Sequence, residues 1–216
     1  MRRCFAFAAG DFYGLRERPR SGDFLVAADA GYLLCQSLGL APDLLIGDFD
    51  SMEAPAHCPA HIERVPVRKD DTDAMLALKA GLSRGCTEFH IYGGAGGRRM
   101  DHTLANLQGL LYLRRHNARG YLYERDFVWT AIENETFEIT NAAPDGLLSV
   151  FALGSRAEGV TIRGASYPAE GVTLRPDFPL GVSNHVSAET ASVSVKRGAL
   201  LIGWELSPPA SGDSGA

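Results

Sequence analysis

Seven aspartates in the first half of the chain lie in four short clusters, each at a place where an apolar segment gives way to a turn. The clusters are Asp29-Ala30-Gly31, Gly47-Asp48-Phe49-Asp50-Ser51, Lys69-Asp70-Asp71-Thr72-Asp73 and Gly97-Arg98-Arg99-Met100-Asp101-His102. Carboxylates are ligands of hard cations such as Mg²⁺, which in small enzymes accompanies nucleotide phosphates. Lys69, Arg98 and Arg99 add the cations that phosphate binding needs. These residue types predict a metal-nucleotide enzyme.

Asp48 and Asp50 are two residues apart. In an extended segment both side chains point the same way, so they can share one metal ion while Phe49 points into the core. Gly-Asp and Asp-Ser pairs are also common in turns. Taken alone, this pair leaves metal binding and turn formation both open.

A helix start accounts for only part of the Lys69–Asp73 cluster. Thr72 is placed to act as the N-cap, and acidic side chains are favoured at the positive end of a helix dipole. Three aspartates within four residues exceed that requirement and repel one another. A bound cation or a phosphate-facing Lys69 would relieve the repulsion, which favours a functional interpretation.

A glycine-rich loop, Gly93–Gly97, is expected to join a strand to a helix. Backbone N–H groups in such a loop can bind an anion, although the sequence matches neither a Walker loop nor a good dinucleotide-binding fingerprint. Arg98 and Arg99 follow at once, and guanidinium groups bind phosphate oxygens in a bidentate fashion. Asp101 has an alternative role as the N-cap of the next helix.

Alternating strand and helix patterns position these clusters. Apolar runs predict a first strand near the N-terminus and further strands over 25–28, 44–46 and 88–92. Helices are predicted over 32–38, 72–84 and from about 101 onward, the first two ended by Gly39 and Gly85. Leu104, Leu107 and Leu111 share one face of the third helix. This alternation favours a largely parallel sheet covered by helices.

The pattern changes after about residue 120 to short β-rich runs without helical periodicity. These runs cover 121–123, 127–132, 136–139, 147–153, 160–162, 191–195 and 199–206. Gly, Pro, Asn and Asp separate them, as in a sandwich or barrel. We therefore predict an α/β N-terminal domain (1–133) with a largely parallel sheet, an all-β, sandwich-like C-terminal domain (134–206) and a disordered tail (207–216).

The composition is that of a globular protein: 216 residues, 45% of them hydrophobic and 22% charged. A net charge of -5 without a basic face argues against nucleic-acid binding. No apolar run approaches the length that spans a bilayer, and the four cysteines follow no disulfide framework, so we expect a cytoplasmic protein with reduced thiols. A zinc site at His57, Cys58 and His61 would lack its fourth ligand.

Taken in order, the motifs resemble thiamine pyrophosphokinases of the bacterial type. The matching segments are Ala28–Gly31, Gly47–Ser51, Lys69–Asp73, Gly94–Asn106 and, in the β-rich half, Gly181–Asn184. The resemblance covers nearly the whole chain apart from the tail, and the ordered set is far more specific than any one motif. It implies an ATP- and Mg²⁺-dependent enzyme, assembled as a homodimer, that moves the pyrophosphoryl group of ATP onto the hydroxyl of thiamine and releases AMP.

The resemblance also implies roles for individual residues. Mg²⁺ would be held by Asp48, Asp50 and Asp73. ATP and its phosphates would contact Asp29, Lys69, Thr72, Gly97, Arg98, Arg99 and His102. Catalysis would involve Asp71, Asp73, Arg99 and Asp101, and thiamine would contact Ser183 and Asn184. Asp71 and Asp101 both remain candidates for accepting the hydroxyl proton.

Two alternatives remain open. A related pyrophosphokinase acting on another small alcohol, such as a pterin, would share the catalytic half and differ in the β-rich half, where Ser183-Asn184 favours thiamine. A non-catalytic regulator would bind nucleotide or thiamine without turnover. The chain departs from the family pattern at Ala30 and Arg98, which stand where glycine is common, and at His185, to which we assign no role.

Overall fold

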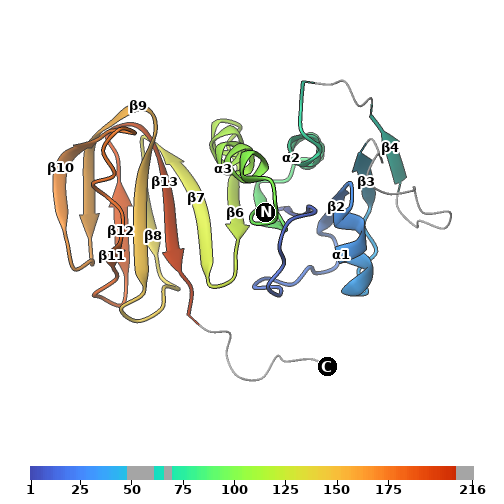
Figure 1. Cartoon of the computed structure of the whole chain (residues 1–216), viewed down its shortest axis with the longest axis horizontal. Helices are drawn as coiled ribbons and strands as arrows, with labels where there is room; N and C mark the ends of the chain where they lie inside the picture. Colours follow the sequence, from blue (N-terminus) through green and yellow to red (C-terminus); the bar gives the residue numbers. More distant parts are fainter. Residues whose placement is uncertain (48–60, 66–69, 208–216) are drawn as a thin grey trace. The chain divides into compact units, whose positions relative to one another are not determined.

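The computed structural model describes residues 1–47, 61–65 and 70–207. The chain divides into two compact units, Met1–Arg125 and Asp126–Ala216, which the sequence colours of Figure 1 separate. The boundary predicted near residue 133 lies one strand, β7 (Phe127–Glu133), after the division at Arg125. The predicted tail lies almost wholly outside the described residues.

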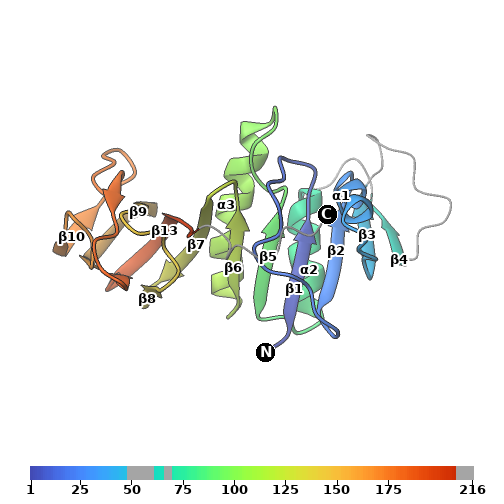
Figure 2. The ribbon, with the colours of Figure 1, turned by 90° about the horizontal axis from the view of Figure 1, so that it is seen from below.

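A parallel sheet forms the centre of the first unit (Figure 2). Among the described residues its strands follow the order β4-β3-β2-β1-β5-β6, and each neighbouring pair is parallel. The strands are β1 (Arg3–Phe7), β2 (Phe24–Ala28), β3 (Leu44–Gly47), β4 (His61–Arg64), β5 (Glu88–Tyr92) and β6 (Arg119–Tyr123). The chain runs outward from β1 to β4, then returns to β5 and runs outward the other way. Such a reversal of strand order, here between β1 and β5, is where α/β sheets form a ligand crevice.

Three helices pack on this sheet within the described part of the unit: α1 (Gly31–Ser37), α2 (Asp73–Ser83) and α3 (Met100–Arg115). Figure 1 shows α2 and α3 on one face and α1 on the other. The predicted N-cap is confirmed, because Thr72 Oγ1 accepts a hydrogen bond from Met75 N at 3.1 Å. Gly39 and Gly85 follow α1 and α2 with positive φ, as predicted. No helix in the described ranges is long and apolar enough to cross a membrane.

Helix α3 begins at Met100, next to the predicted start, but Asp101 does not cap it. The predicted N-cap, Asp101, is wrong: the cap position is Arg99, without a side-chain cap, and Asp101 lies inside the first turn. The Asp101 carboxylate instead accepts two hydrogen bonds from the Arg99 guanidinium. Leu104, on the predicted apolar face, is 56% exposed. The buried side of α3 consists of Asn106, Gly109, Leu110 and Leu113.

The second unit is all-β in its described residues, as predicted, and its strand pairs are antiparallel. Besides β7 its strands are β8 (Thr136–Ile139), β9 (Leu147–Arg163), β10 (Ala169–Leu174), β11 (Asn184–His185), β12 (Ala191–Ser194) and β13 (Arg197–Glu205). The predicted runs 147–153 and 160–162 are one strand of 17 residues, which is a correction. Its first part pairs with β11 and β13 and its second with β10 and β12. Gly154 and Gly159 have positive φ where β9 changes partners, which lets the strand bend.

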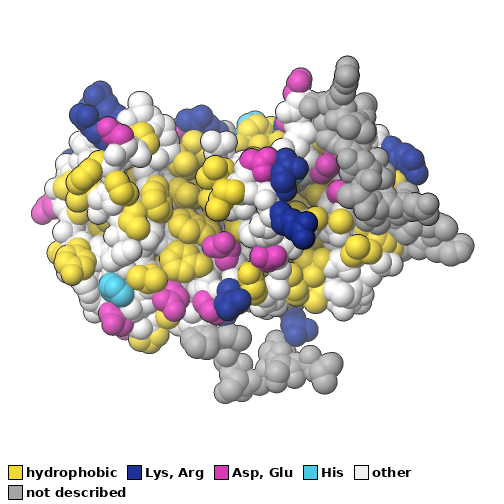
Figure 3. Space-filling view, viewed as in Figure 1, with side chains coloured by type: hydrophobic (Ala, Val, Ile, Leu, Met, Phe, Trp, Pro, Cys, Tyr) yellow, Lys and Arg dark blue, Asp and Glu magenta, His cyan; other side chains and the backbone are white. Residues whose placement is uncertain are grey.

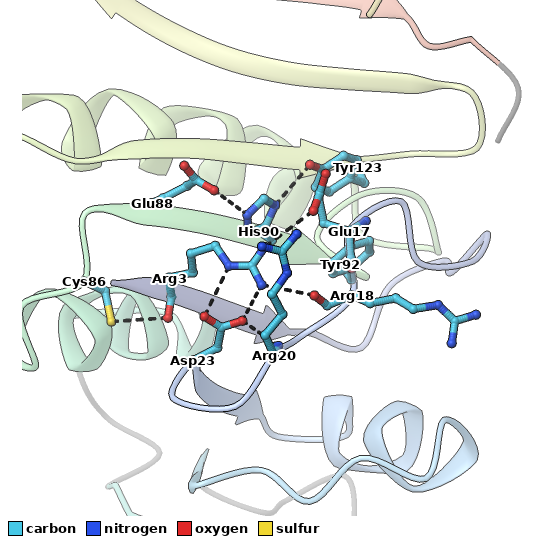
Figure 4. Close-up of polar contacts among 10 residues, drawn as sticks. All are labelled: Arg3, Glu17, Arg18, Arg20, Asp23, Cys86, Glu88, His90, Tyr92 and Tyr123. Atoms are coloured by element: carbon cyan, nitrogen blue, oxygen red, sulfur yellow. Dashed lines mark hydrogen bonds and ion pairs between the residues drawn. The ribbon is translucent and has the colours of Figure 1, made fainter. Parts of the chain in front are cut away.

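A polar network fixes the long connection between β1 and β2 to the sheet (Figure 4). Arg3, on β1, donates to both carboxylate oxygens of Asp23 at 3.2 and 2.5 Å and to Glu17 at 3.4 Å. The Tyr92 hydroxyl donates to Glu17 O and accepts from Glu17 N. The middle and the C-terminal end of a connection without regular secondary structure are thereby held in place next to the strands that lead to the crevice.

His90, on β5, is 3% exposed and has a partner on each ring nitrogen. Its Nε2 lies 2.9 Å from Glu88 Oε1 and its Nδ1 lies 3.1 Å from the Tyr123 hydroxyl. A neutral ring satisfies both partners, because Nε2–H can donate to the carboxylate while Nδ1 accepts from the tyrosine. Burial lowers the pKa of His90 and outweighs the nearby Glu88 carboxylate, which raises it.

We predict that His90 makes the fold less stable in mild acid. The pKa of His90 is lowered in the folded state. Below about pH 6.5, the pKa of histidine in an unfolded chain, the unfolded protein therefore binds a proton that the folded protein does not bind. The free energy of unfolding should therefore fall with pH below about 6.5, at up to about 1.4 kcal/mol per pH unit. Urea unfolding between pH 8 and 5 should show a smaller decline for His90→Gln than for the wild type. The exposed His116→Gln should follow the wild type; parallel curves for His90→Gln would contradict the assignment.

Candidate active site

A cavity of about 230 Å³ lies at the carboxyl ends of β1, β2 and β5, at the reversal of strand order. Residues 8–10, 28–29 and 93–97, which end or follow these strands, line it together with the first turn of α2 and the first two turns of α3. Six of the predicted site residues meet at this cavity: Asp29, Asp73, Gly97, Arg98, Arg99 and His102. Carboxylates and guanidinium groups thus share one concave surface.

The glycine-rich loop is held by the loop that follows β1. Gly10 N donates to Gly93 O at 2.7 Å, and Asp11 N donates to Ala95 O at 2.9 Å. A Cβ at Gly93 would overlap the Ala8 carbonyl oxygen, and Gly93 has a φ of 65°. Only glycine combines a positive φ with the absence of a Cβ that would overlap Ala8 O. Backbone packing alone therefore explains the glycine at position 93, without a ligand.

The predicted anion-binding face of this loop is already partly used. Gly97 N donates to Asp11 Oδ2 at 3.1 Å, and a Cβ at Gly96 would overlap the Asp11 carboxylate. An anion that used the Gly97 N–H would therefore have to replace a carboxylate. The cations that follow the loop are the more accessible partners for a phosphate.

Asp29 directly follows β2 and has a left-handed conformation, with a φ of 48°. Its backbone N donates to Ile46 O at 2.8 Å, and a Cβ at Gly47 would lie 3.1 Å from the Asp29 Cα. The ends of β2 and β3 are thus in close backbone contact. Asp48 and Asp50 follow β3 directly in sequence, but they and Lys69 lie outside the described residues. Their predicted metal and phosphate contacts stay predictions.

The start of α2 separates the two aspartates assigned to it. Asp73 is the first residue of the helix and lines the cavity. Asp71 lies before the Thr72 cap and does not belong to the lining; both of its carboxylate oxygens accept from Lys79 Nζ, at 2.8 and 2.6 Å. Lys79 Nζ also lies 5.9 Å from the centre of the Tyr112 ring. Asp71 is thereby paired with a cation on the helix that follows it.

Arg99 and Asp101 form a bidentate pair at the edge of the cavity. The Arg99 Nε and Nη2 atoms lie 2.9 and 2.7 Å from the two Asp101 oxygens. The guanidinium hydrogen bonds lower the pKa of Asp101 to about 2. Both side chains are about two-thirds exposed, at 66% and 65%, so the pair contributes little to stability and its partners can exchange.

Metal binding by several described residues together is not apparent. No group of three or more His, Cys, Asp or Glu side chains suited to a metal ion occurs within residues 1–47, 61–65 and 70–207. Asp29 and Asp73 nevertheless place two carboxylates around one cavity, and oxygen donors of this kind fit a hard divalent cation. A metal site here would need ligands beyond the described ranges or from the substrate.

Ser183 and Asn184 lie in the second unit and are held by local hydrogen bonds. Ser183 has a φ of 59°, and its N donates to Ser149 Oγ at 3.3 Å. The buried Asn184 side chain accepts from Tyr167 N at 2.9 Å and donates to Tyr167 O at 2.7 Å. Its amide thereby fixes the backbone of Tyr167, whose side chain is 72% exposed.

Several lining residues were not assigned from the sequence: Ala8, Ala9, Gly10, Thr103 and Asn106. The apolar run before Gly10 is typical of the end of a strand, and its composition does not indicate a binding site. Asn106 does follow a recognisable pattern, because it lies four residues after His102 and three after Thr103 on the same helix.

Comparison with known proteins identifies the chain. Residues 16–122 match the family model for the thiamin pyrophosphokinase catalytic domain, and residues 136–200 match the model for the thiamin pyrophosphokinase vitamin B1 binding domain. Together the two matches span well over half of the chain. The chain belongs to the thiamine pyrophosphokinase family. The resemblance inferred from the order of the acidic motifs is confirmed, and the second match lies in the half in which a pterin-specific enzyme would differ.

Individual relatives agree with this assignment. A curated thiamine pyrophosphokinase from Bacillus subtilis is 24% identical over 184 residues, which is 82% of this chain and 85% of the relative. The crystal structure of a Bacillus subtilis thiamine pyrophosphokinase superposes with a TM-score of 0.84 at 22% identity, covering 96% of this chain and all of the other. One from Geobacillus thermodenitrificans gives 0.82 at 21% identity over 97% and 99% of the two chains. At these identities the superpositions establish the fold, and the family models carry the assignment.

We predict that a methyl group at Gly93 separates the two loops of the cavity. Gly93→Ala must accept both a positive φ and an overlap with Ala8 O, so it should lower the free energy of unfolding by about 3 kcal/mol or more. Gly39→Ala is the matched control: its φ is 64°, but nothing lies within 4 Å of the added Cβ. It should cost only about 1–2 kcal/mol, the backbone contribution alone. Equal losses in urea unfolding of the two variants would contradict the close approach of the loops.

Proposed function

We propose that this chain transfers the pyrophosphoryl group of ATP to the hydroxyl of thiamine, giving thiamine diphosphate and AMP. The observation that carries the proposal is the ordered match to a catalytic and a vitamin B1 binding domain of one family. The cavity of the first unit supports it chemically, because guanidinium groups and carboxylates surround a space at the carboxyl ends of parallel strands. Transfer of this kind is catalysed chiefly by positioning and by neutralising negative charge.

In the proposed reaction the thiamine hydroxyl oxygen attacks the β-phosphorus of ATP. The bond from that phosphorus to the oxygen bridging it to the α-phosphorus breaks, and AMP leaves with the bond electrons. The hydroxyl proton passes to a carboxylate. Arg98 and Arg99 would bind phosphate oxygens at the cavity, with Lys69, Thr72, Gly97, His102 and Asp29 as further contacts around the nucleotide.

Asp101 is the proton acceptor that we favour over Asp71. Lys79 holds both oxygens of Asp71, which lies outside the cavity lining. Arg99 holds both oxygens of Asp101, but the same guanidinium fork cannot bind a phosphate and keep that carboxylate. We propose that a phosphate takes this Nε and Nη2 edge of Arg99, which would release Asp101 and raise its pKa from about 2, making it a better base.

Mg²⁺ is the cation that we propose for the site, held by Asp73 together with Asp48 and Asp50. The Asp73 carboxylate at the cavity and its oxygen chemistry fit such an ion. Bound Mg²⁺ would neutralise part of the triphosphate charge. The chain's own contribution is to place carboxylates on one side of the cavity and Arg98 and Arg99 on another.

Thiamine would be bound with the help of the second unit. Asn184 fixes the Tyr167 backbone, which leaves an exposed aromatic ring beside Ser183-Asn184 for a heteroaromatic ligand. On the face drawn in Figure 3, hydrophobic side chains gather over this unit. Large exposed hydrophobic residues within it are Leu147, Tyr167, Phe178, Leu180 and Val182. We propose that this sandwich-like domain uses the exposed hydrophobic surface to form a homodimer. We also propose that the protein is cytoplasmic, because free thiols such as Cys4, Cys35 and Cys86 persist in that compartment.

The products of a single incubation test the reaction. With Mg²⁺, ATP and thiamine, we expect AMP and thiamine diphosphate to appear in equal amounts and only when thiamine is present. Chromatography of the nucleotides and of the thiamine compounds measures both. ADP with thiamine monophosphate would contradict the proposal, because those products come from transfer of a single phosphoryl group. ATP binding without turnover would instead support a regulator.

We predict that Asp73→Asn reduces kcat by about 100-fold or more, because the cavity loses a carboxylate while the size of the side chain is kept. We expect the same of Asp50→Asn. The matched control is Asp70→Asn, an exposed aspartate of the same cluster, which should retain activity within a few-fold. Thermal unfolding should show all three variants folded. Near-normal turnover in Asp73→Asn would remove this aspartate from the metal and phosphate site.

A further inference from the structure

Asn106 is a buried amide at the floor of the cavity. It lies on the second turn of α3 and is 9% exposed. His102 and Thr103, four and three residues earlier on the same helix face, line the cavity with it. Asn106 also borders a small void beneath the cavity whose other lining residues are all apolar, most of them alanines. The Asn106 side chain therefore lies between the polar residues of the cavity and the apolar residues beneath it.

The orientation of the Asn106 amide is fixed by one hydrogen bond. Its Nδ2 donates to Gly94 O, in the glycine-rich loop, at 2.6 Å. A carbonyl oxygen accepts but cannot donate, so the nitrogen must face Gly94 and Oδ1 is left for another partner. Within the described part of the chain, Gly94 is the partner that this side chain has, and no donor to Oδ1 accompanies it.

We propose that Asn106 binds and positions the nucleotide: Oδ1 accepts a hydrogen bond from the bound ATP–metal complex, while Nδ2 holds the glycine-rich loop. The assignment rests on ATP being the substrate of this site. Oδ1 keeps accessible surface toward the cavity that Asn106 lines, so water can supply its donor when no nucleotide is bound. A ligand that enters the cavity and brings a donor takes the place of that water.

Two groups of the ATP–metal complex can supply the donor. One is the amino group of adenine, and the other is a water molecule bound to the metal ion. Purine riboside triphosphate, which lacks the amino group, distinguishes them. The shared requirement is an acceptor at Asn106 Oδ1, and Asn106→Leu removes it.

Nucleotide binding by the full chain tests the assignment, measured by calorimetry with Mg²⁺ and without thiamine. We expect Asn106→Leu to weaken ATP binding by about tenfold, as loss of one hydrogen bond predicts. Gln108→Leu is the matched control, because it makes the same amide-to-aliphatic change at an exposed position of the same helix. It should bind ATP like the wild type.

The analogue then identifies the donor. If the adenine amino group is the donor, the wild type should bind purine riboside triphosphate about tenfold more weakly than ATP, and Asn106→Leu should bind both equally. If metal-bound water is the donor, Asn106→Leu should lose the same factor for both nucleotides and lose nothing when Mg²⁺ is omitted. Either result supports a ligand contact, since a purely structural residue would not alter the dependence on the amino group or on the metal.

The assignment is overturned if folded Asn106→Leu binds ATP as tightly as the wild type. Should this variant fail to fold in circular dichroism and thermal unfolding, Asn106→Ala gives the same comparison without overlap with its neighbours. A loss of affinity in both variants that is the same with and without Mg²⁺, and the same for both nucleotides, would also overturn it. Failure of the wild type itself to bind ATP would overturn the proposed function instead.

Discussion

The loops that follow β1 and β5 lie so close together that their backbones leave no room for a side chain between them. Gly10 N donates to Gly93 O at 2.7 Å, and a Cβ at Gly10 would lie 2.5 Å from Ala95 O. These two strands are neighbours at the reversal of strand order, where the loops above a parallel sheet normally part and open a crevice. Tying the loops at their base gives the crevice a fixed floor, and the site residues are arranged around that floor.

Two aspartates next to the cavity have their own counter-ions. Asp71 is paired with Lys79, and Asp101 is paired with Arg99. Exposed pairs of this kind add little to the stability of the fold. Their consequence is chemical: aspartates that would repel one another can be kept close together, and a ligand that takes the cation of a pair releases its carboxylate. A phosphate at the Nε and Nη2 edge of Arg99 would be such a ligand.

Much of this could be predicted from the sequence where local rules decide. The Thr72 cap, the glycines that end α1 and α2, and the strand Glu88–Tyr92 all follow from nearby residues. Helix α3 begins near the predicted residue, but the N-cap role considered for Asp101 was wrong because Arg99 binds its carboxylate. That kind of competition between partners depends on geometry beyond the local pattern.

The parts that could not be predicted depend on contacts between distant segments. Gly10 and Asp11 belong to the site because the topology places β1 beside β5, about 80 residues away in sequence. A nucleotide-binding role for Asn106 could be proposed only from its burial and its contact with Gly94, which the sequence does not show. Strand β9 looked like two runs because its middle residues are polar and glycine-containing, yet it continues through a change of partners.

The central claim, that the nucleotide and its metal bind above the tied loops of β1 and β5, can be tested directly by paramagnetic relaxation. Mn²⁺ would replace Mg²⁺ in its complex with ATP, and amide signals of the isotopically labelled full chain would be recorded by NMR. We predict selective broadening of amides in residues 8–10, 28–29 and 93–97, which line the cavity. Signals of these segments that stay sharp, while amides elsewhere broaden, would contradict the claim.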